Sequence, residues 1–265
     1  MTRRFARLIH TGSSPELVTG WRVMRGFLEK QAGLSPAANF ISEGVGCRRK
    51  FREYDRPLSL DEIENEILLD DAPSFSVGLG GVHEKAIARA VGYQRDVAGD
   101  TLFTLSFESE DAPDWSPLMA MSNAVLNLVY GYSHLQSYVG WQSESDIRRY
   151  EKNYGSAESR PKIIKGPPPL DGLAIDTSRN PGREVQENGE FQGVAADMWF
   201  APRFWERRKL TPEDVVRAVP SAKAEDAMGL TRIRSFPREF DRPDGEQGEI
   251  QKALWKVLFD REVEW

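Results

Sequence analysis

Residues 103–129 read FTLSFESEDAPDWSPLMAMSNAVLNLV, and this stretch decides the fold class. Its first five residues, Phe103 to Phe107, alternate apolar and polar side chains, as a strand with one buried face does. Ser116 and Pro117 then open a helix, because serine caps a first turn and proline fits into it. The apolar stripe expected behind this start holds Leu118, Met121, Val125, Leu128 and Val129.

Similar patterns on both sides of this stretch extend the mixture of strands and helices. Upstream, they predict a strand at residues 5–10, a helix opened by Ser14 and Pro15 that ends near Gly33, a capping box from Ser59 to Glu62, and a strand at 75–79. Downstream, they predict strands at 138–141, 192–200 and 230–236, a short helix begun by Ser143 and Asp146, a helix capped by Thr211, and a C-terminal helix marked by Ile250, Leu254 and Leu258. Buried strands and crossover helices do not alternate strictly. The prediction is therefore an α+β fold, a mostly antiparallel sheet packed with helices.

The chain of 265 residues is long enough for one large domain or for two subdomains. Residues 156–190 contain the run Lys165-Gly-Pro-Pro-Pro169, which cannot form a helix or a central strand. They also contain Asn180-Pro-Gly182, which is a turn signal. We expect an N-terminal α+β domain at 1–155, a loop or linker at 156–190 and a C-terminal α+β subdomain at 191–265.

Charge is distributed unevenly along the chain, whose formal net charge is −6. Residues 57–147 hold three basic and fifteen acidic residues, while residues 1–56 hold eleven basic and five acidic ones. An acidic field of this kind repels nucleic acid and attracts a basic protein surface. The alternative is an acidic face that serves only solubility. Direct nucleic-acid binding is disfavoured, since it needs a clustered basic footprint.

Two acidic groups are the candidate partner-binding residues. The first, on or after the predicted helix that Ser59 opens, consists of Glu62, Glu66, Asp70 and Asp71. The second, on the loop after the strand at 103–107, consists of Glu108, Glu110, Asp111 and Asp114. Loops at strand ends are common recognition sites. Each group predicts docking of a cationic protein surface.

Residues that could carry out chemistry do not form a recognisable constellation in the sequence. The single cysteine, Cys47, precedes three basic residues but has no nearby histidine signature. The three histidines, His10, His83 and His134, lack metal-ligand spacing, and the glycine turn at 78–81 lacks the spacing of a phosphate loop. We expect no catalytic residue, no cofactor and no metal. Two alternatives stay open, a small-molecule hydrolase or transferase that uses Cys47 or carboxylates, and a homo-oligomeric scaffolding protein.

A cytoplasmic location is the expectation from cysteine content and hydropathy. One thiol cannot form an internal disulfide, so the fold does not need an oxidising compartment. No stretch approaches the roughly 18 apolar residues needed to cross a bilayer. The N-terminal apolar run is also too short for a signal peptide. No membrane association is therefore predicted.

An aromatic motif gives the chain a family resemblance. The stretch Trp199-Phe-Ala-Pro-Arg-Phe-Trp205, the glycine turn at 78–81 and the single-cysteine α+β body resemble immunity proteins encoded beside polymorphic or type VI secretion toxins. Within that group, the chain is most similar to the immunity protein 52 class, which is associated with restriction-endonuclease-like toxins. The resemblance implies tight, stoichiometric neutralisation of a cognate nuclease toxin. Trp199 itself is expected either in the core or at an interface hot spot.

Overall fold

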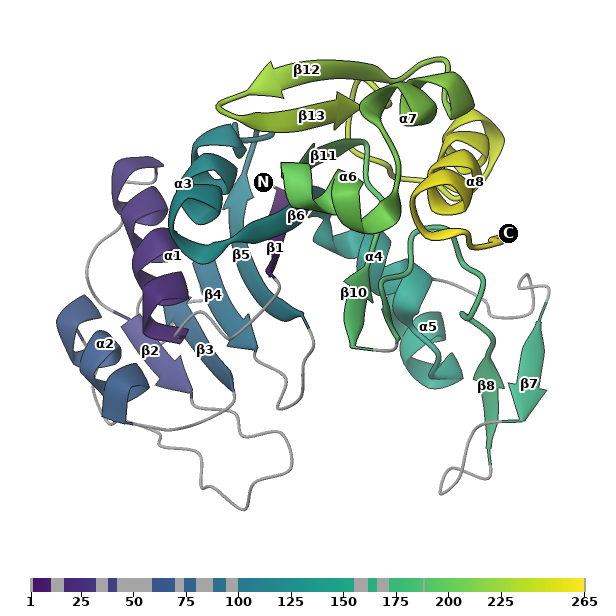
Figure 1. The fold of residues 1–265 in the computed structure, drawn as a ribbon. Coiled ribbons are helices and arrows are strands. Elements are labelled where there is room, and N and C mark those ends of the chain that lie inside the picture. The colour runs from purple at the N-terminus through teal and green to yellow at the C-terminus, as the bar shows by residue number, and fades with distance from the viewer. Residues whose placement is uncertain are drawn as a thin grey trace.

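A computed structural model describes the chain over residues 2–10, 17–31, 38–41, 59–69, 74–79, 88–93, 100–154, 162–165, 172–187 and 189–264. The fold is α+β and is built on one large antiparallel sheet (Figure 1). Nine strands form this sheet in the order β12-β13-β11-β6-β1-β5-β4-β3-β2. Their bounds are β1 Thr2–His10, β2 Ala38–Ile41, β3 Ser74–Leu79, β4 Ala88–Tyr93, β5 Thr101–Ser109, β6 Leu128–Leu135, β11 Asp197–Phe200, β12 Lys223–Ala227 and β13 Leu230–Arg234.

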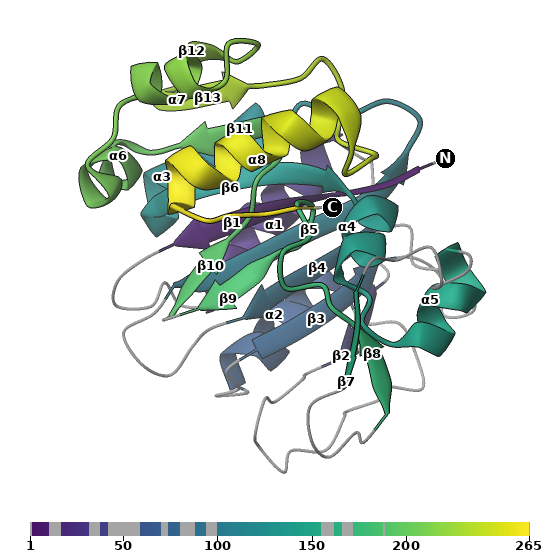
Figure 2. The ribbon, with the colours of Figure 1, turned by 90° about the vertical axis from the view of Figure 1, so that its right-hand side faces the viewer.

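Helices cover both faces of the sheet. On one face lie α1 (Leu17–Gln31), α2 (Leu60–Leu69) and α3 (Ser116–Leu126); on the other lie α4 (Gln136–Ser143), α6 (Pro202–Arg208), α7 (Pro212–Ala218) and α8 (Gly245–Phe259) (Figures 1 and 2). Successive side chains of a strand point to opposite faces. Leu8 and Trp199 accordingly join the core cluster under α1 and α3, whereas Ile9 and Phe200 join the cluster under α6 and α8. The central strands are thus buried on both sides.

Several elements predicted from sequence are confirmed. Strands β1, β3, β5 and β13 and helices α2, α3, α5 (Ile147–Tyr154), α7 and α8 lie where the patterns placed them. The predicted capping box of α2 is present: the Ser59 amide donates to Glu62 Oε2 at 2.8 Å, and the Glu62 amide donates to Ser59 Oγ at 3.2 Å. Thr211 and Asp214 form the same reciprocal pair at α7. Ser14, Pro15 and Gly33 lie outside the described residues.

Two sequence predictions near residue 130 are wrong. The expected strand at 138–141 is part of helix α4, where Tyr138 and Gln142 are buried one turn apart. A short apolar run cannot by itself distinguish a strand from a helix. The predicted stripe of α3 also fails at Val125, which is 58% exposed, because the buried face of the helix runs through Leu118, Met119, Ser122 and Leu126. The helix then ends at Asn127, which lies in the left-handed region (φ 57°). The chain beyond becomes strand β6 and carries Leu128 into the sheet.

The predicted linker at 156–190 holds short strands in its described parts. They are β7 (Ile163–Lys165), which pairs with β8 (Leu173–Ile175), and β9 (Val185–Glu187), which pairs with β10 (Glu190–Gln192). Strands from before and after this segment, β6 and β11, pair in the same sheet. Division of the chain into independently folding units at these boundaries stays a prediction. No helix in the described part of the chain is long and apolar enough to cross a bilayer.

Candidate partner-binding surface

An open cleft lies where the loop after β5 meets the segment that follows β13. Its volume is about 360 Å³. Its walls come from residues 112–115, from β6 and β11, and from β13 with the following turn: Ala112, Pro113, Asp114, Trp115, Ser133, Ala196, Asp197, Arg232, Arg234, Phe236, Pro237, Arg238 and Glu239. Asp114 is the sequence-predicted partner-binding residue that this cleft includes.

Two ion pairs hold the residues that line the cleft. Arg232 donates two hydrogen bonds to Asp197, at 2.7 and 2.5 Å, and its guanidinium lies 4.9 Å from the ring centroid of the buried Trp199. These hydrogen bonds raise the pKa of Arg232 above its ordinary value. Arg4 donates to Glu239 Oε2 at 2.9 Å. Burial raises the pKa of Glu239, although Arg4 opposes that shift. Asp197 and Glu239 are therefore already paired inside the molecule.

The two sides of the cleft carry opposite exposed charges. On one side lies the loop after β5, where Glu110, Asp111 and Asp114 are exposed and Asp114 lines the cleft; we call these three residues the acidic rim. On the other side, Arg234 and Arg238 are 46% and 69% exposed and reach acids only at 3.9 and 3.6 Å. Glu108 is not part of the rim, because it is paired with Arg3 at 2.8 Å. The surface is thus of mixed charge, not uniformly acidic as the sequence alone suggested.

Of the first acidic group of the sequence prediction, Glu62 lies on α2, which packs against α1. The carboxylate of Glu62 caps α2, and the neighbouring Asp61 and Glu64 pair with Arg25 at 2.8 Å and with Arg22 at 2.6 Å. These contacts hold α2 to α1. The side chain of Glu66 and all of Asp70 and Asp71 lie outside the described residues, so a role for this group in partner binding stays a prediction.

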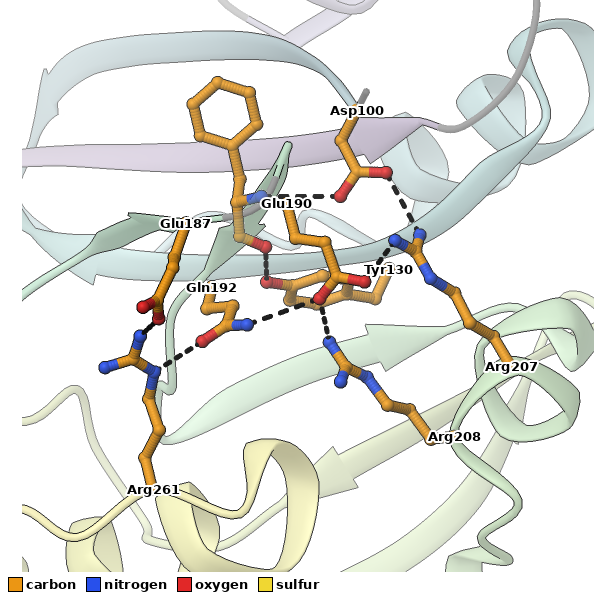
Figure 3. Close-up of polar contacts among 9 residues, drawn as sticks. Asp100, Tyr130, Glu187, Glu190, Gln192, Arg207, Arg208 and Arg261 are labelled. Carbon is orange, nitrogen blue, oxygen red and sulfur yellow. Dashed lines mark hydrogen bonds and ion pairs between the residues drawn. The ribbon is translucent and has the colours of Figure 1, made fainter. Parts of the chain in front are cut away.

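A second polar cluster surrounds the hairpin β9–β10 and is internally paired (Figure 3). Arg207 contacts both Asp100, at 3.1 Å, and Glu190, and Arg208 contacts Glu190 at 2.5 Å. Arg261 donates to Gln192 at 2.7 Å and pairs with Glu187. Burial alone would raise the pKa of Glu190, but the two arginines outweigh it and the pKa lies below its ordinary value. This cluster fastens the hairpin to α6 and the C-terminus.

The histidines that the structure describes are core residues. His10 Nε2 lies 2.5 Å from Ser122 Oγ, and His134 Nε2 lies 2.7 Å from the carbonyl of Val194. Both rings are buried, and burial lowers the pKa of His10 to about 3 and that of His134 to about 4. Within the described residues, no group of three or more His, Cys, Asp or Glu is placed to hold a metal ion. Cys47 and His83 lie outside the described residues.

The aromatic motif at 199–205 is packed in the core. Trp199 and Phe200 have no exposed surface, Phe204 is 1% exposed and Trp205 is 8% exposed. The rings of Phe200 and Phe204 lie 4.6 Å apart between centroids, and those of Phe200 and Trp205 lie 4.7 Å apart. Of the two readings of Trp199, the core position is correct.

Sequence reasoning missed the arginines and Glu239 that line the cleft. The alternating pattern of the strand at 230–236 does place Arg232 and Arg234 on the same face of the strand, while Ile233 between them points to the other face. That signal predicts a basic stripe on a strand. It cannot tell that the stripe lies beside residues 112–115, because that contact requires β13 to pair with β11 and β11 with β6.

No protein-family model matches this chain, and no curated protein matches it. Two solved structures are similar in part. A T6SS protein of Pseudomonas aeruginosa aligns at 13% identity with a TM-score of 0.49, covering 97% of this chain and 73% of that chain. A chain from the complex of the toxic C-terminal tip of CdiA from Pseudomonas aeruginosa with its immune protein aligns at 16% identity with a TM-score of 0.22, covering 51% and 87%. Both alignments are too distant to carry a functional conclusion, and the immunity protein 52 class stays a prediction.

Proposed function

We propose that this protein is a cytoplasmic immunity protein that binds and neutralises a cognate secreted toxin, and that the toxin is a nuclease. One observation carries the proposal: one short loop exposes three carboxylates, those of Glu110, Asp111 and Asp114, and Asp114 also lines an open cleft. A nuclease needs a basic groove for phosphates, and carboxylates on a protruding loop offer that groove a complementary surface. The resemblance of the sequence to immunity proteins supports the same partner class.

The rigidity of the surface also supports a binding role. The acidic rim follows β5, whose residues pair with β1 along its whole length from Thr101 to Ser109. Arg4 anchors the end of this strand by donating to the Ser109 carbonyl at 2.8 Å. Pro113 and the buried Trp115 then lead directly into α3. A loop held at both ends loses little conformational entropy on docking, which favours tight association.

The test is the binding kinetics of the product of the adjacent gene in the native host, purified as its toxin domain. The triple variant Glu110→Lys, Asp111→Lys, Asp114→Lys should slow association about tenfold or more and flatten its dependence on salt, because steering acts mainly on the association rate. The matched control reverses Glu151, Glu206 and Glu249, which are exposed on α5, α6 and α8. It changes the net charge equally but leaves the rim intact.

Equal kinetics for the two triple variants would show that the rim is not the docking site. A toxin domain that does not bind the unaltered protein at all would contradict the proposed function itself. A nuclease assay on the complex tests the inhibition itself. The proposal requires that cleavage of DNA or RNA is lost when one equivalent of this protein is added.

A further inference from the structure

Strand β12 forms one edge of the large sheet, and its Glu225 lies 3.6 Å from Arg232 and 3.9 Å from Arg234 of the neighbouring cleft. It is the terminal strand of the large sheet, and no described strand pairs with its outer side. Four of its five residues are exposed, from Lys223 to Asp226. An edge strand presents unpaired backbone groups, so it is a template for another strand unless its side chains prevent pairing. The side chains of β12 therefore decide what this edge accepts.

The hairpin geometry fixes which backbone groups are free. Met228 and Gly229 connect β12 to β13 with positive φ values of 58° and 80°, as a two-residue type I′ turn requires. Ala227 and Leu230, which flank this turn, form a hydrogen-bonded pair, and such pairs alternate along the ladder with pairs that exchange no hydrogen bonds. Ala224 and Asp226 consequently direct their N–H and C=O groups away from β13, toward the free edge.

The charge sequence around Ala224 is self-complementary. A second copy that pairs antiparallel with Ala224 opposite Ala224 places Lys223 opposite Glu225 of the copy, and Glu225 opposite its Lys223. These cross-strand positions exchange no hydrogen bonds, so their side chains lie closest together, and opposite charges there are favourable. The other two-fold registers that the outward-facing residues allow place Glu225 against Glu225 or Asp226 against Asp226, and both are unfavourable. The sequence thus selects one register.

We propose that β12 is a self-association edge, through which two copies of this chain join their sheets antiparallel about Ala224. The contact is one short strand, below the roughly 1,200 Å² of a stable interface, so the dimer is weak and forms in the micromolar to millimolar range. The proposal does not depend on the toxin, because its test needs only the purified chain.

The experiment is sedimentation equilibrium of the full chain from about 10 µM to about 1 mM, the range that a small interface requires. The unaltered protein should pass from monomer to dimer. Lys223→Glu alone and Glu225→Lys alone should each weaken dimerisation about tenfold or more, because each places like charges opposite one another twice. An equimolar mixture of the two variants should form the heterodimer, and the double swap should restore the homodimer.

Circular dichroism of each variant keeps this test independent of folding, and restored association in the mixture cannot come from an unfolded chain. Ala224→Pro adds a backbone control, since it removes an outward N–H while leaving the β12–β13 hydrogen bonds in place. A chain that stays monomeric at the highest concentration would overturn the proposal. The charged side chains of β12 would then serve to prevent pairing of this edge with another strand. A dimer that neither charge reversal nor proline weakens would overturn it equally.

Discussion

Arg7 and Glu184 form a two-point ion pair between the central strand β1 and the segment that precedes β9. The Nε and Nη2 atoms of Arg7 lie 2.8 and 2.6 Å from the two carboxylate oxygens of Glu184, and each side chain is 22% exposed. Tyr132 adds a third contact by donating to Glu184 Oε1 at 2.9 Å. Burial would raise the pKa of Glu184, but Arg7 outweighs it and lowers the pKa below its ordinary value.

Removal of Arg7 should therefore cost more stability than removal of the whole pair. Arg7→Ala leaves the partly buried Glu184 without its cation, and we expect a loss of about 2–3 kcal/mol in the free energy of unfolding. The double variant Arg7→Met, Glu184→Leu removes both charges and should lose clearly less. Urea unfolding of the two variants and the parent measures the difference. A double variant as unstable as the single one would contradict this account.

Acidification should destabilise the protein through its buried histidines. Their folded-state pKa values, about 3 for His10 and about 4 for His134, lie below the ordinary 6.5. At pH values between the folded-state pKa and 6.5, each histidine is protonated in the unfolded chain but not in the folded chain. Stability therefore falls as the pH drops below 6.5, and above pH 6.5 it does not depend on these histidines. Each histidine contributes a slope of about 1.4 kcal/mol per pH unit in that window.

The variant His134→Gln isolates one of these contributions. Glutamine can still donate to the Val194 carbonyl but does not titrate. The slope of unfolding free energy against pH should therefore decrease between pH 6 and pH 4.5, by about 1.4 kcal/mol per unit. Because the slope is compared, a change in absolute stability does not affect the test. A slope identical to that of the parent would show that His134 is protonated in the folded state.

Helix α1 contains two glycines that should respond oppositely to alanine. A Cβ atom at Gly20 would lie 2.1 Å from Cε1 of Phe103, a ring that is 1% exposed and cannot move aside. At Gly26 the nearest atom is Cε of Met121, at 3.4 Å. Gly20→Ala should destabilise the protein by about 1–3 kcal/mol through overpacking. Gly26→Ala should be neutral or stabilise it by up to about 1 kcal/mol through helix propensity. Thermal unfolding of both variants is the measurement.

Arg232 should not tolerate lysine, although the charge is kept. Its side chain is 16% exposed, and it combines a forked contact to Asp197 with a position over the Trp199 ring. Lysine reproduces neither the fork nor the planar stacking. Arg232→Lys should cost about 1–2 kcal/mol. Arg234→Lys, at the 46% exposed neighbour on the same strand, should change stability by less than about 0.5 kcal/mol. Similar losses at both positions would refute this distinction.

Local elements were predictable wherever neighbouring residues decide them. The capping box at Ser59 and the cap at Thr211 depend on contacts within a few residues, and both are present in the structure. The alternation at 103–107 predicted strand β5 correctly but predicted only one buried face, whereas Thr104 and Ser106 are buried as well. Prediction failed where the local signal is ambiguous. Residues 138–141 form a helix because Tyr138 and Gln142 fit the same buried site, with Tyr138 donating to Gln251 of α8 at 2.9 Å. No local pattern contains that long-range contact.

In the candidate surface, too, the sequence predicted the residue types but not their long-range contacts. The sequence identified Glu108, Glu110, Asp111 and Asp114 by composition alone. The structure separates them, because Arg3 lies opposite Glu108 in the β1–β5 register and pairs with it.

What the sequence determined by itself is the α+β class, the caps, the net charge and the two acidic groups, since these follow from residue type and short spacing. Only the tertiary structure decided which acids are paired, that the aromatic motif is core, and that β13 lies beside the loop after β5. The physical reason is that ion pairing and burial depend on sheet order. Sheet order joins residues more than a hundred positions apart, and it is set by the packing of both faces of the sheet together, not by any single strand.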